Sequence, residues 1–317
     1  MIIHALDIGG SSIKHALVDT EQEVGQIAQS FESLPLRSKD FNDLQDQVIE
    51  AVSMVYSSDK RVSTVAISTT GGVSEEGVVI NAGHFKGYTN ISWNSILKSR
   101  MRNIKNVFTN NDGKASTWAE YLGASQPKIH VHYVIGTGIG GATIVRGEFL
   151  IGSNGSTGHL GHIKVTNSET PRCSCGNYGC VETVAAGPAI VRYFHENRSK
   201  HKLQDGFSLQ EIFAAAQSGD PLAKNAIDVA GEYLGIALSN VMNILNPDII
   251  TIGGGVVLAS NQGDGDDGKN LFIQAIIRSA QKRAHKRAVE AAEIRSSRFG
   301  NNGGLIGTAF LAHSSKT

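Results

Sequence analysis

The feature of this sequence that most constrains its fold is a strand–turn–strand unit that occurs twice. The first unit spans residues 2–18 and turns at the glycine- and serine-rich residues 8–12. The second spans residues 131–145 and turns at the glycine-rich residues 136–141. Apolar runs interrupted by a glycine-rich turn are typical of a β-hairpin. Two related hairpins in one chain predict a duplicated nucleotide-binding fold with the ligand between its halves.

The length of the chain also favours two domains. Its 317 residues are too many for one ordinary core but suit two domains. Residues 41–56 carry apolar residues at helical spacing between strand-like runs, which indicates a mixed α/β sheet. We expect an α/β N-terminal lobe of residues 1–115, closed by a C-terminal helix at 304–317, and a larger α/β lobe of residues 116–303.

Charge and hydropathy exclude two classes of partner. Lysine plus arginine total 29 and aspartate plus glutamate total 29, so no long-range field attracts a polyanion. No apolar stretch approaches the roughly 18 to 20 residues that a membrane-spanning helix requires, and the N-terminus has no signal-peptide pattern. We therefore expect a cytoplasmic protein that binds neither nucleic acid nor membranes.

Three glycine-rich turns each follow an apolar strand. A single turn of this kind is equally well explained as a tight hairpin, but three are difficult to explain as independent accidents. Backbone amides in such turns can bind phosphate oxygens, and a carboxylate nearby can hold magnesium or its waters. The residues expected to contact a nucleotide and its phosphates are Asp7, Gly9, Gly10, Ser11, Ser12, Lys14, Gly136, Thr137, Gly138, Gly140, Gly253, Gly254 and Gly255, with Asp7 also the expected magnesium ligand.

The three cysteines of the chain lie within one eight-residue window. Cys173, Cys175 and Cys180 follow His162, and three thiolates with one imidazole match a closed tetrahedral zinc site. Because four protein ligands leave no position for a catalytic water, we expect the zinc to be structural. The alternative is three reduced core cysteines near an unrelated histidine, but the glycines and polar residues between them are poor core residues.

A carboxylate that follows a strand-like run is the candidate catalytic base. Asp112 lies after residues 107–108 and before a helical pattern at 114–122. An aspartate at a strand end can accept a proton from an attacking hydroxyl. Asp and Asn are also preferred helix N-caps, so the sequence alone leaves both roles open for Asp112.

Together these motifs resemble the ROK family of sugar kinases and sugar-responsive repressors over essentially the whole chain. The first turn matches the family's Asp-x-Gly-Gly-Thr motif, with Ser11 preserving a hydroxyl in place of threonine. Residues 173–182 fit the family's Cys-x-Cys-Gly-x-x-Gly-Cys-x-Glu motif completely. The resemblance implies a two-lobed, duplicated actin-like/ribonuclease-H-like ATPase fold with an interlobe cleft. It also implies ATP, Mg²⁺ and a structural Zn²⁺ as cofactors, and a homodimer formed through the larger lobe.

The resemblance also implies roles for individual residues. The pair Asn111 and Asp112 matches the family's Asn-Asp pair, which implies that Asp112 is the base and Asn111 a sugar contact. Glu182, which ends the cysteine motif, is implied to bind a sugar hydroxyl. The residues expected to contact the sugar are Gly72, Asn111, Asp112, His159, His162 and Glu182.

One departure from the family pattern bears on the substrate. Most kinases of the family carry Glu-x-Gly-His, whereas this chain has His159 before Leu160, Gly161 and His162, which is similar to bacterial N-acetylmannosamine kinases. A carboxylate only accepts hydrogen bonds, whereas a neutral imidazole also donates one, and an acetamido carbonyl needs a donor. We expect phosphorylation of the 6-hydroxyl of N-acetyl-D-mannosamine, with glucose and N-acetylglucosamine as alternatives. Alternatively, His159 only packs within the zinc loop.

Two other classes of function fit the sequence less well. A sugar-sensing repressor of the same family would carry an N-terminal helix-turn-helix, whereas here the first turn begins at Asp7, and the neutral net charge disfavours DNA binding. A catalytically inactive sugar-binding module is disfavoured because both Asp7 and Asp112 are retained.

Overall fold

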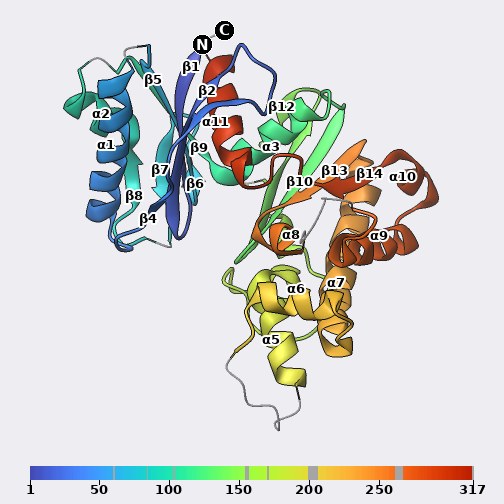
Figure 1. The fold of residues 1–317 in the computed structure, drawn as a ribbon. Coiled ribbons are helices and arrows are strands. Elements are labelled where there is room, and N and C mark those ends of the chain that lie inside the picture. The colour runs from blue at the N-terminus through green and yellow to red at the C-terminus, as the bar shows by residue number, and fades with distance from the viewer. Residues whose placement is uncertain are drawn as a thin grey trace. The chain divides into compact units, whose positions relative to one another are not determined.

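The computed structural model divides the chain into two compact units (Figure 1). The first unit combines Met1–Ser125 with Asn302–Thr317, and the second unit is Gln126–Asn301. The structure describes residues 1–59, 61–83, 85–102, 104–153, 157–169, 171–198, 206–260 and 267–315.

The division of the chain differs from the boundary expected between residues 115 and 116, which would lie inside helix α3 (Asp112–Gly123). Helix α3 packs against the C-terminal helix α11 (Gly303–Ser314). The two backbones approach so closely that a Cβ on Gly307 would lie 1.6 Å from the carbonyl oxygen of Ala115. Because α3 packs against α11, the whole of α3 belongs to the first unit.

The first unit is built on a six-stranded sheet with the order β3-β2-β1-β5-β9, and a short β4 pairs with β2. Strands β1 and β2 form the predicted antiparallel hairpin, whereas β1, β5 and β9 are parallel. In this register Asp7 lies beside Lys14 on one side and Ser68 on the other. The strands are β1 (Ile2–Ile8), β2 (Ser12–Asp19), β3 (Ile27–Ser30), β4 (Leu34–Pro35), β5 (Thr64–Thr69) and β9 (Asn106–Asn111).

Helices α1 and α11 cover opposite faces of this sheet (Figure 1). Helix α1 begins after the N-cap Asp40, and its apolar stripe, which includes Leu44 and Val48, joins a core with Leu6 and Ile8 of β1. A small antiparallel sheet follows β5 in the chain. The remaining elements of the unit are α1 (Phe41–Ser58), β6 (Gly72–Val73), β7 (Val78–Asn81), β8 (Thr89–Ser92) and α2 (Trp93–Arg100).

The second unit repeats the sheet of the first. Its five strands have the order β12-β11-β10-β13-β14, with an antiparallel hairpin of β10 and β11 and parallel pairing from β10 through β13 to β14. In both sheets, therefore, the hairpin is extended on one side by an antiparallel strand and on the other by two parallel strands. The prediction of a duplicated α/β fold is confirmed. The strands are β10 (Ile129–Ile135), β11 (Ile139–Val145), β12 (Glu148–Phe149), β13 (Ile249–Gly253) and β14 (Glu293–Ser296).

The helices of the second unit pack with its sheet in a large apolar core. Helix α7 begins with Asp220 as N-cap and Pro221 at its first turn, and it ends at the left-handed Asn246. It packs closely on α9 because Gly231 and Gly235 leave no side chain between the helices. None of the described helices is both long and apolar enough to span a bilayer. The helical elements are η1 (Leu160–His162), α4 (Glu182–Ala185), α5 (Gly187–Asn197), α6 (Leu209–Gln217), α7 (Pro221–Leu245), α8 (Gly255–Ser260), α9 (Leu271–Arg283), α10 (Lys286–Ala291) and η2 (Gly300–Asn302).

Candidate active site and metal centre

The junction of β9 and α3 carries the candidate catalytic base. Strand β9 ends at Asn111, and α3 begins with Asp112. The side-chain oxygen of Asn111 accepts a hydrogen bond from the amide of Lys114 over 3.1 Å, so Asn111 is the N-cap. Asp112 is the first residue of the helix, and the capping role that the sequence left open for it belongs to its neighbour.

The surroundings of Asp112 fix its carboxylate and change its proton affinity. Its Oδ1 accepts hydrogen bonds from the amide of Gly113 (2.8 Å) and from Nδ2 of Asn111 (3.0 Å). Burial raises the pKa of Asp112 from 3.8 to about 7, and the negative charge of Asp7 acts in the same direction. A carboxyl group that exchanges a proton near neutral pH is suited to general base catalysis.

The carboxylate of Asp7 is held at the end of β1. Ser68 donates a hydrogen bond to Asp7 Oδ1 over 2.7 Å. Burial raises the pKa of Asp7, whereas the hydrogen bond from Ser68 and the charge of Lys14 oppose the increase. The first turn of α11 lies against the carboxylate, since a Cβ on Gly304 would lie 2.6 Å from Oδ1. The N-terminal end of a helix stabilises negative charge, so it also opposes the increase in the pKa of Asp7.

The first predicted phosphate turn follows β1. Its geometry is fixed by a hydrogen bond from the amide of Gly9 to the carbonyl of Ser12 (3.0 Å). Gly10 and Ser11 are exposed. Within the described part of the chain, the amides of these two residues have no protein acceptor. The turn therefore has two backbone donors available for an anion.

The second predicted turn joins β10 to β11. The amide of Gly136 donates to the carbonyl of Gly138 (2.9 Å), and Gly141 has a φ of 154° where a Cβ would lie 1.9 Å from the carbonyl oxygen of His132. The amide of Ile139 donates to Glu182 Oε2 over 2.8 Å. Among the described residues, no protein group accepts from the amides of Thr137 and Gly138. This turn also offers donors to an anion, although its third amide already binds a carboxylate.

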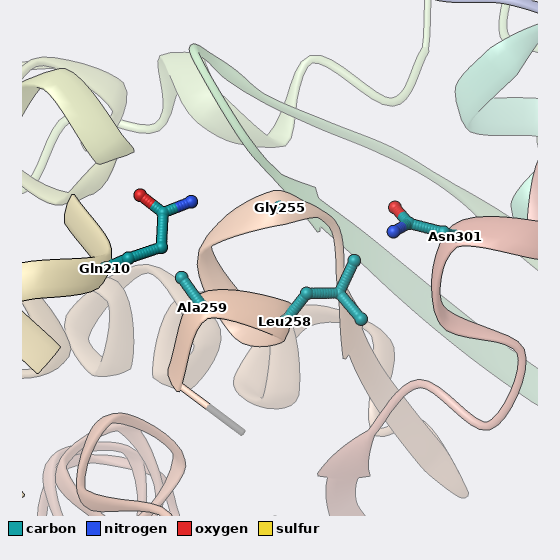
Figure 2. Close-up of a pocket in the computed structure, with 5 residues that line it drawn as sticks. All are labelled: Gln210, Gly255, Leu258, Ala259 and Asn301. Carbon is teal, nitrogen blue, oxygen red and sulfur yellow. The ribbon is translucent and has the colours of Figure 1, made fainter. Parts of the chain in front are cut away.

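The third predicted turn lies beside a pocket of about 340 Å³ (Figure 2). Gly253 ends β13, and Gly254 adopts a φ of 94°, where a Cβ would lie 2.4 Å from the carbonyl oxygen of Ile135. The carboxamides of Gln210 and Asn301 lie on opposite sides of the pocket, and apolar side chains lie between them (Figure 2). The lining residues are Gln210, Gly255, Leu258, Ala259 and Asn301.

Only one of these lining residues, Gly255, was predicted from the sequence to contact a nucleotide. Gln210 lies near the start of α6, and Leu258 and Ala259 belong to α8. Neither helix carries a motif that marks a binding site, so no sequence signal could have identified these positions. The pocket presents both carboxamide groups and apolar side chains to a molecule that binds there.

The four predicted metal ligands come together. One ligand atom from each of His162, Cys173, Cys175 and Cys180 lies within 4.8 Å of all the others. The sulfur of Cys173 lies 3.5 Å from Nδ1 of His162, and those of Cys175 and Cys180 lie 3.6 Å apart without a disulfide. Ligands at about 2.3 Å from a tetrahedral zinc are separated by about 3.8 Å. The donor set and its spacing therefore fit a closed structural zinc site.

The loop that holds the cysteines depends on tight turns. Gly176 (φ 89°) and Gly179 (φ 78°) are both in the left-handed region, and a Cβ on Gly179 would lie 2.0 Å from the carbonyl oxygen of Thr166. The amide of Cys173 donates to the carbonyl of Asn177 (2.9 Å). These turns bring three cysteines that are close in sequence to one point.

The residues expected to contact the sugar are distributed over both units. Gly72, Asn111 and Asp112 belong to the first unit. There Asn111 Nδ2 also donates to the carbonyl of Gly71 (2.9 Å), which ties the turn before Gly72 to the candidate base. The other three, His159, His162 and Glu182, belong to the second unit.

The histidines of the second unit lie beside the metal ligands. The rings of His159 and His162 have centroids 5.8 Å apart, and His159 is exposed. Glu182 lies near the same loop, since Ser174 donates to its Oε1 over 3.5 Å. His159, which stands where most kinases of the family have glutamate, therefore lies next to the candidate zinc centre.

Comparisons with known proteins identify one family along almost the whole chain. The ROK family model matches residues 3–315. An N-acetylmannosamine kinase of Vibrio cholerae is 31% identical over 259 residues, which are 80% of this chain and 84% of that protein. A ROK family glucokinase from Streptomyces griseus, solved with glucose and AMPPNP, has a TM-score of 0.80 and 26% identity, and the match covers 99% of this chain and 100% of that one.

A protein of another class is also similar. A ROK family transcriptional regulator, a homologue of the E. coli MLC protein, has a TM-score of 0.83 and 26% identity. The match covers 99% of this chain and 78% of the regulator. Sequence and fold thus resemble both sugar kinases and a regulator over nearly the whole chain.

Proposed function

The chain belongs to the ROK family, and from this membership we propose that it is an ATP-dependent sugar kinase that phosphorylates the 6-hydroxyl of a hexose. The observation that carries the proposal is the state of Asp112. Its neighbour Asn111 caps the helix, and its pKa of about 7 is that of a carboxyl able to take a proton near neutral pH. Because Asn111 already caps α3, Asp112 is not needed as the cap.

In the proposed reaction, Asp112 accepts the proton of the sugar 6-hydroxyl while that oxygen attacks the γ-phosphorus of ATP in line with the leaving ADP. Such transfers depend mainly on positioning and on stabilisation of charge. Asn111 holds the carboxylate of Asp112 through Nδ2. The sugar is oriented by Asn111, His159, His162 and Glu182, and Gly72 contributes backbone beside it.

We assign the nucleotide to the three glycine-rich turns. The exposed first turn and the second turn each have two amides without a protein acceptor in the described part of the chain, which supports a role in binding phosphates. The adenosine is assigned to the pocket at Gly255, where Leu258 and Ala259 offer apolar surface to the base and the carboxamides of Gln210 and Asn301 offer polar contacts. This assignment extends the predicted contact at residues 253–255 to residues that the sequence did not indicate.

Two metals complete the proposal. Bound magnesium neutralises charge on the phosphates, and Asp7 would hold the ion or its waters. Zinc would bind His162, Cys173, Cys175 and Cys180 and stabilise the loop without taking part in the reaction. The sulfur and nitrogen spacing supports this ligand set. We further propose that the second unit forms a homodimer, as the family resemblance implies.

For the sugar itself we propose N-acetyl-D-mannosamine. His159 stands where most family kinases have glutamate, and it can donate a hydrogen bond to an acetamido oxygen. The similarity to the kinase of Vibrio cholerae is consistent with this substrate, but glucokinases are similar to this chain to the same degree. The glucokinase of Streptomyces griseus, at 26% identity, makes glucose the principal alternative.

The test is a coupled assay of ADP release with N-acetylmannosamine, mannose, N-acetylglucosamine and glucose. We expect ADP release with those of the four sugars that are substrates, and the highest kcat/KM with N-acetylmannosamine. A preference for glucose would leave the kinase intact but overturn the assigned substrate. If none of the sugars supports ADP release, the kinase proposal is wrong.

A sugar-responsive regulator is the second candidate, because a regulator of this family has a TM-score of 0.83 with this chain. The same assay separates the two candidates when sugar binding is measured in parallel by calorimetry. A regulator would bind a hexose without releasing ADP, whereas a kinase would do both.

A further inference from the structure

The carboxylate of Glu182 contacts the second glycine-rich turn directly. Glu182 is the first residue of α4, and its Oε2 accepts a hydrogen bond from the amide of Ile139 over 2.8 Å. Ile139 is the first residue of β11, so this contact fixes the point where the turn becomes a strand. Hydrogen bonds to an ionised group are about twice as strong as neutral ones.

Gly138, the residue before Ile139, leaves room for this contact because it has no side chain. A Cβ on Gly138 would lie 2.5 Å from Glu182 Oε2 and 3.3 Å from its Cδ, so an added methyl group would push the carboxylate out of its present position. Gly138 does not have a positive φ, so its backbone conformation does not demand glycine. A side chain at this position would therefore compete with the carboxylate of Glu182 for the same space.

The other carboxylate oxygen of Glu182 faces the metal loop. Its Oε1 lies 3.5 Å from the hydroxyl of Ser174 and 3.9 Å from the sulfur of Cys173. A single side chain thus spans the distance between the metal loop and the turn that offers the amides of Thr137 and Gly138. A contact of Glu182 with sugar alone would not require its second oxygen to bind the turn.

We propose that Glu182 is a positioning residue for the phosphates of the nucleotide, in addition to its assigned contact with sugar. It holds residues 136–139 in one conformation, so that the turn does not have to be ordered when the phosphates bind. This inference rests on the proposed kinase function. It assigns to Glu182 an effect on nucleotide affinity that is present when no sugar is bound.

The test measures binding of magnesium AMPPNP without sugar, by calorimetry, to the parent and to three variants. Glu182→Ala removes the acceptor, and Gly138→Ala adds a methyl group where the carboxylate lies. Each is expected to weaken AMPPNP binding by roughly 5- to 20-fold. In the double variant the added methyl group no longer meets a carboxylate, so its affinity should equal that of Glu182→Ala, which is the non-additivity expected of one shared contact.

Two further variants serve as controls, and the zinc content of every variant is measured. Glu182→Gln keeps an oxygen that can accept from Ile139, so it should bind AMPPNP within about 3-fold of the parent. Ser174→Ala removes one of the two neighbours of the other carboxylate oxygen, leaves the contact with Ile139 in place, and should leave AMPPNP affinity unchanged.

Three results would each contradict a different part of the proposal. If Glu182→Ala with its zinc intact binds AMPPNP as tightly as the parent or more tightly, Glu182 does not position the turn. Additive losses in the double variant would overturn the shared contact. If the parent itself binds no AMPPNP, the proposed kinase function fails, and the inference about Glu182 fails with it.

Discussion

Asn111 donates a hydrogen bond from Nδ2 to Oδ1 of Asp112 over 3.0 Å, while its own Oδ1 caps helix α3 through the amide of Lys114. One side chain therefore begins the helix and also fixes the adjacent carboxylate. Because the cap is already supplied, Asp112 can be changed without removing the start of α3, and its role can be tested separately from helix stability.

The first prediction follows from this separation. Asp112→Asn should lower kcat by about 10² or more while sugar and ATP binding stay near those of the parent, since the shape is kept and the base is lost. Steady-state kinetics and calorimetric sugar binding provide the measurement. A turnover within a few-fold of the parent would show that Asp112 is not the base.

The second prediction concerns pH. Burial and the charge of Asp7 raise the pKa of Asp112 to about 7, so the carboxyl is protonated and unable to act as a base below that value. The kcat/KM for sugar should therefore rise with pH and level off above about 7, because the proton is lost as pH increases. A flat profile between pH 5 and 8 in the parent would contradict this assignment. The residual activity of Asp112→Asn should lack the acidic limb.

The third prediction concerns the metal centre. We expect about one zinc per chain by elemental analysis. Cys175→Ser should lose both the metal and sugar affinity, because His162, which lies next to His159, is also one of the metal ligands. An exposed serine outside this loop, Ser99, provides the control as Ser99→Ala, which should retain zinc. Full activity in protein verified to contain no metal would show that the centre does not organise the site.

The fourth prediction concerns the sugar. If His159 donates to the acetamido oxygen, His159→Glu should shift the ratio of kcat/KM towards sugars with a free 2-hydroxyl by about 5- to 150-fold, the effect of one buried hydrogen bond left unsatisfied. The measurement compares N-acetylmannosamine with glucose. An unchanged ratio with zinc intact would remove the physical support for N-acetylmannosamine. A larger change with loss of zinc would indicate a misfolded loop.

The fifth prediction tests the pocket in Figure 2. Leu258 is only partly buried, so Leu258→Trp should fill the pocket without disrupting the core and raise the KM for ATP by at least about 10-fold. Calorimetric sugar binding should be unchanged, which also verifies folding. Ile244→Trp adds the same bulk at an exposed position of the same unit and should leave both constants near the parent. An unchanged KM for ATP in Leu258→Trp would place the adenosine elsewhere.

Much of this molecule was predictable from the sequence because the relevant signals are local. The two hairpins are marked by apolar alternation and glycine-rich turns, and both sheets have the predicted duplication. The three cysteines lie within eight residues, so a short loop is sufficient to bring Cys173, Cys175 and Cys180 together. Asp112 was recognisable as a candidate base from its place between a strand and a helix.

Only the tertiary structure decided the contacts between segments distant in the chain. Sheet register places Ser68 beside Asp7, and the packing of α11 on α3 assigns the whole of α3 to the first unit. The contact of Glu182 with Ile139, 43 residues apart, has no sequence signal. Such contacts depend on how faces of helices and strands meet, whereas sequence periodicity specifies each face without specifying its partner. The pocket in Figure 2 is assembled from α6, α8 and Asn301, which are distant in the chain, so the sequence alone did not indicate it. The cysteine loop is local and was evident from the sequence.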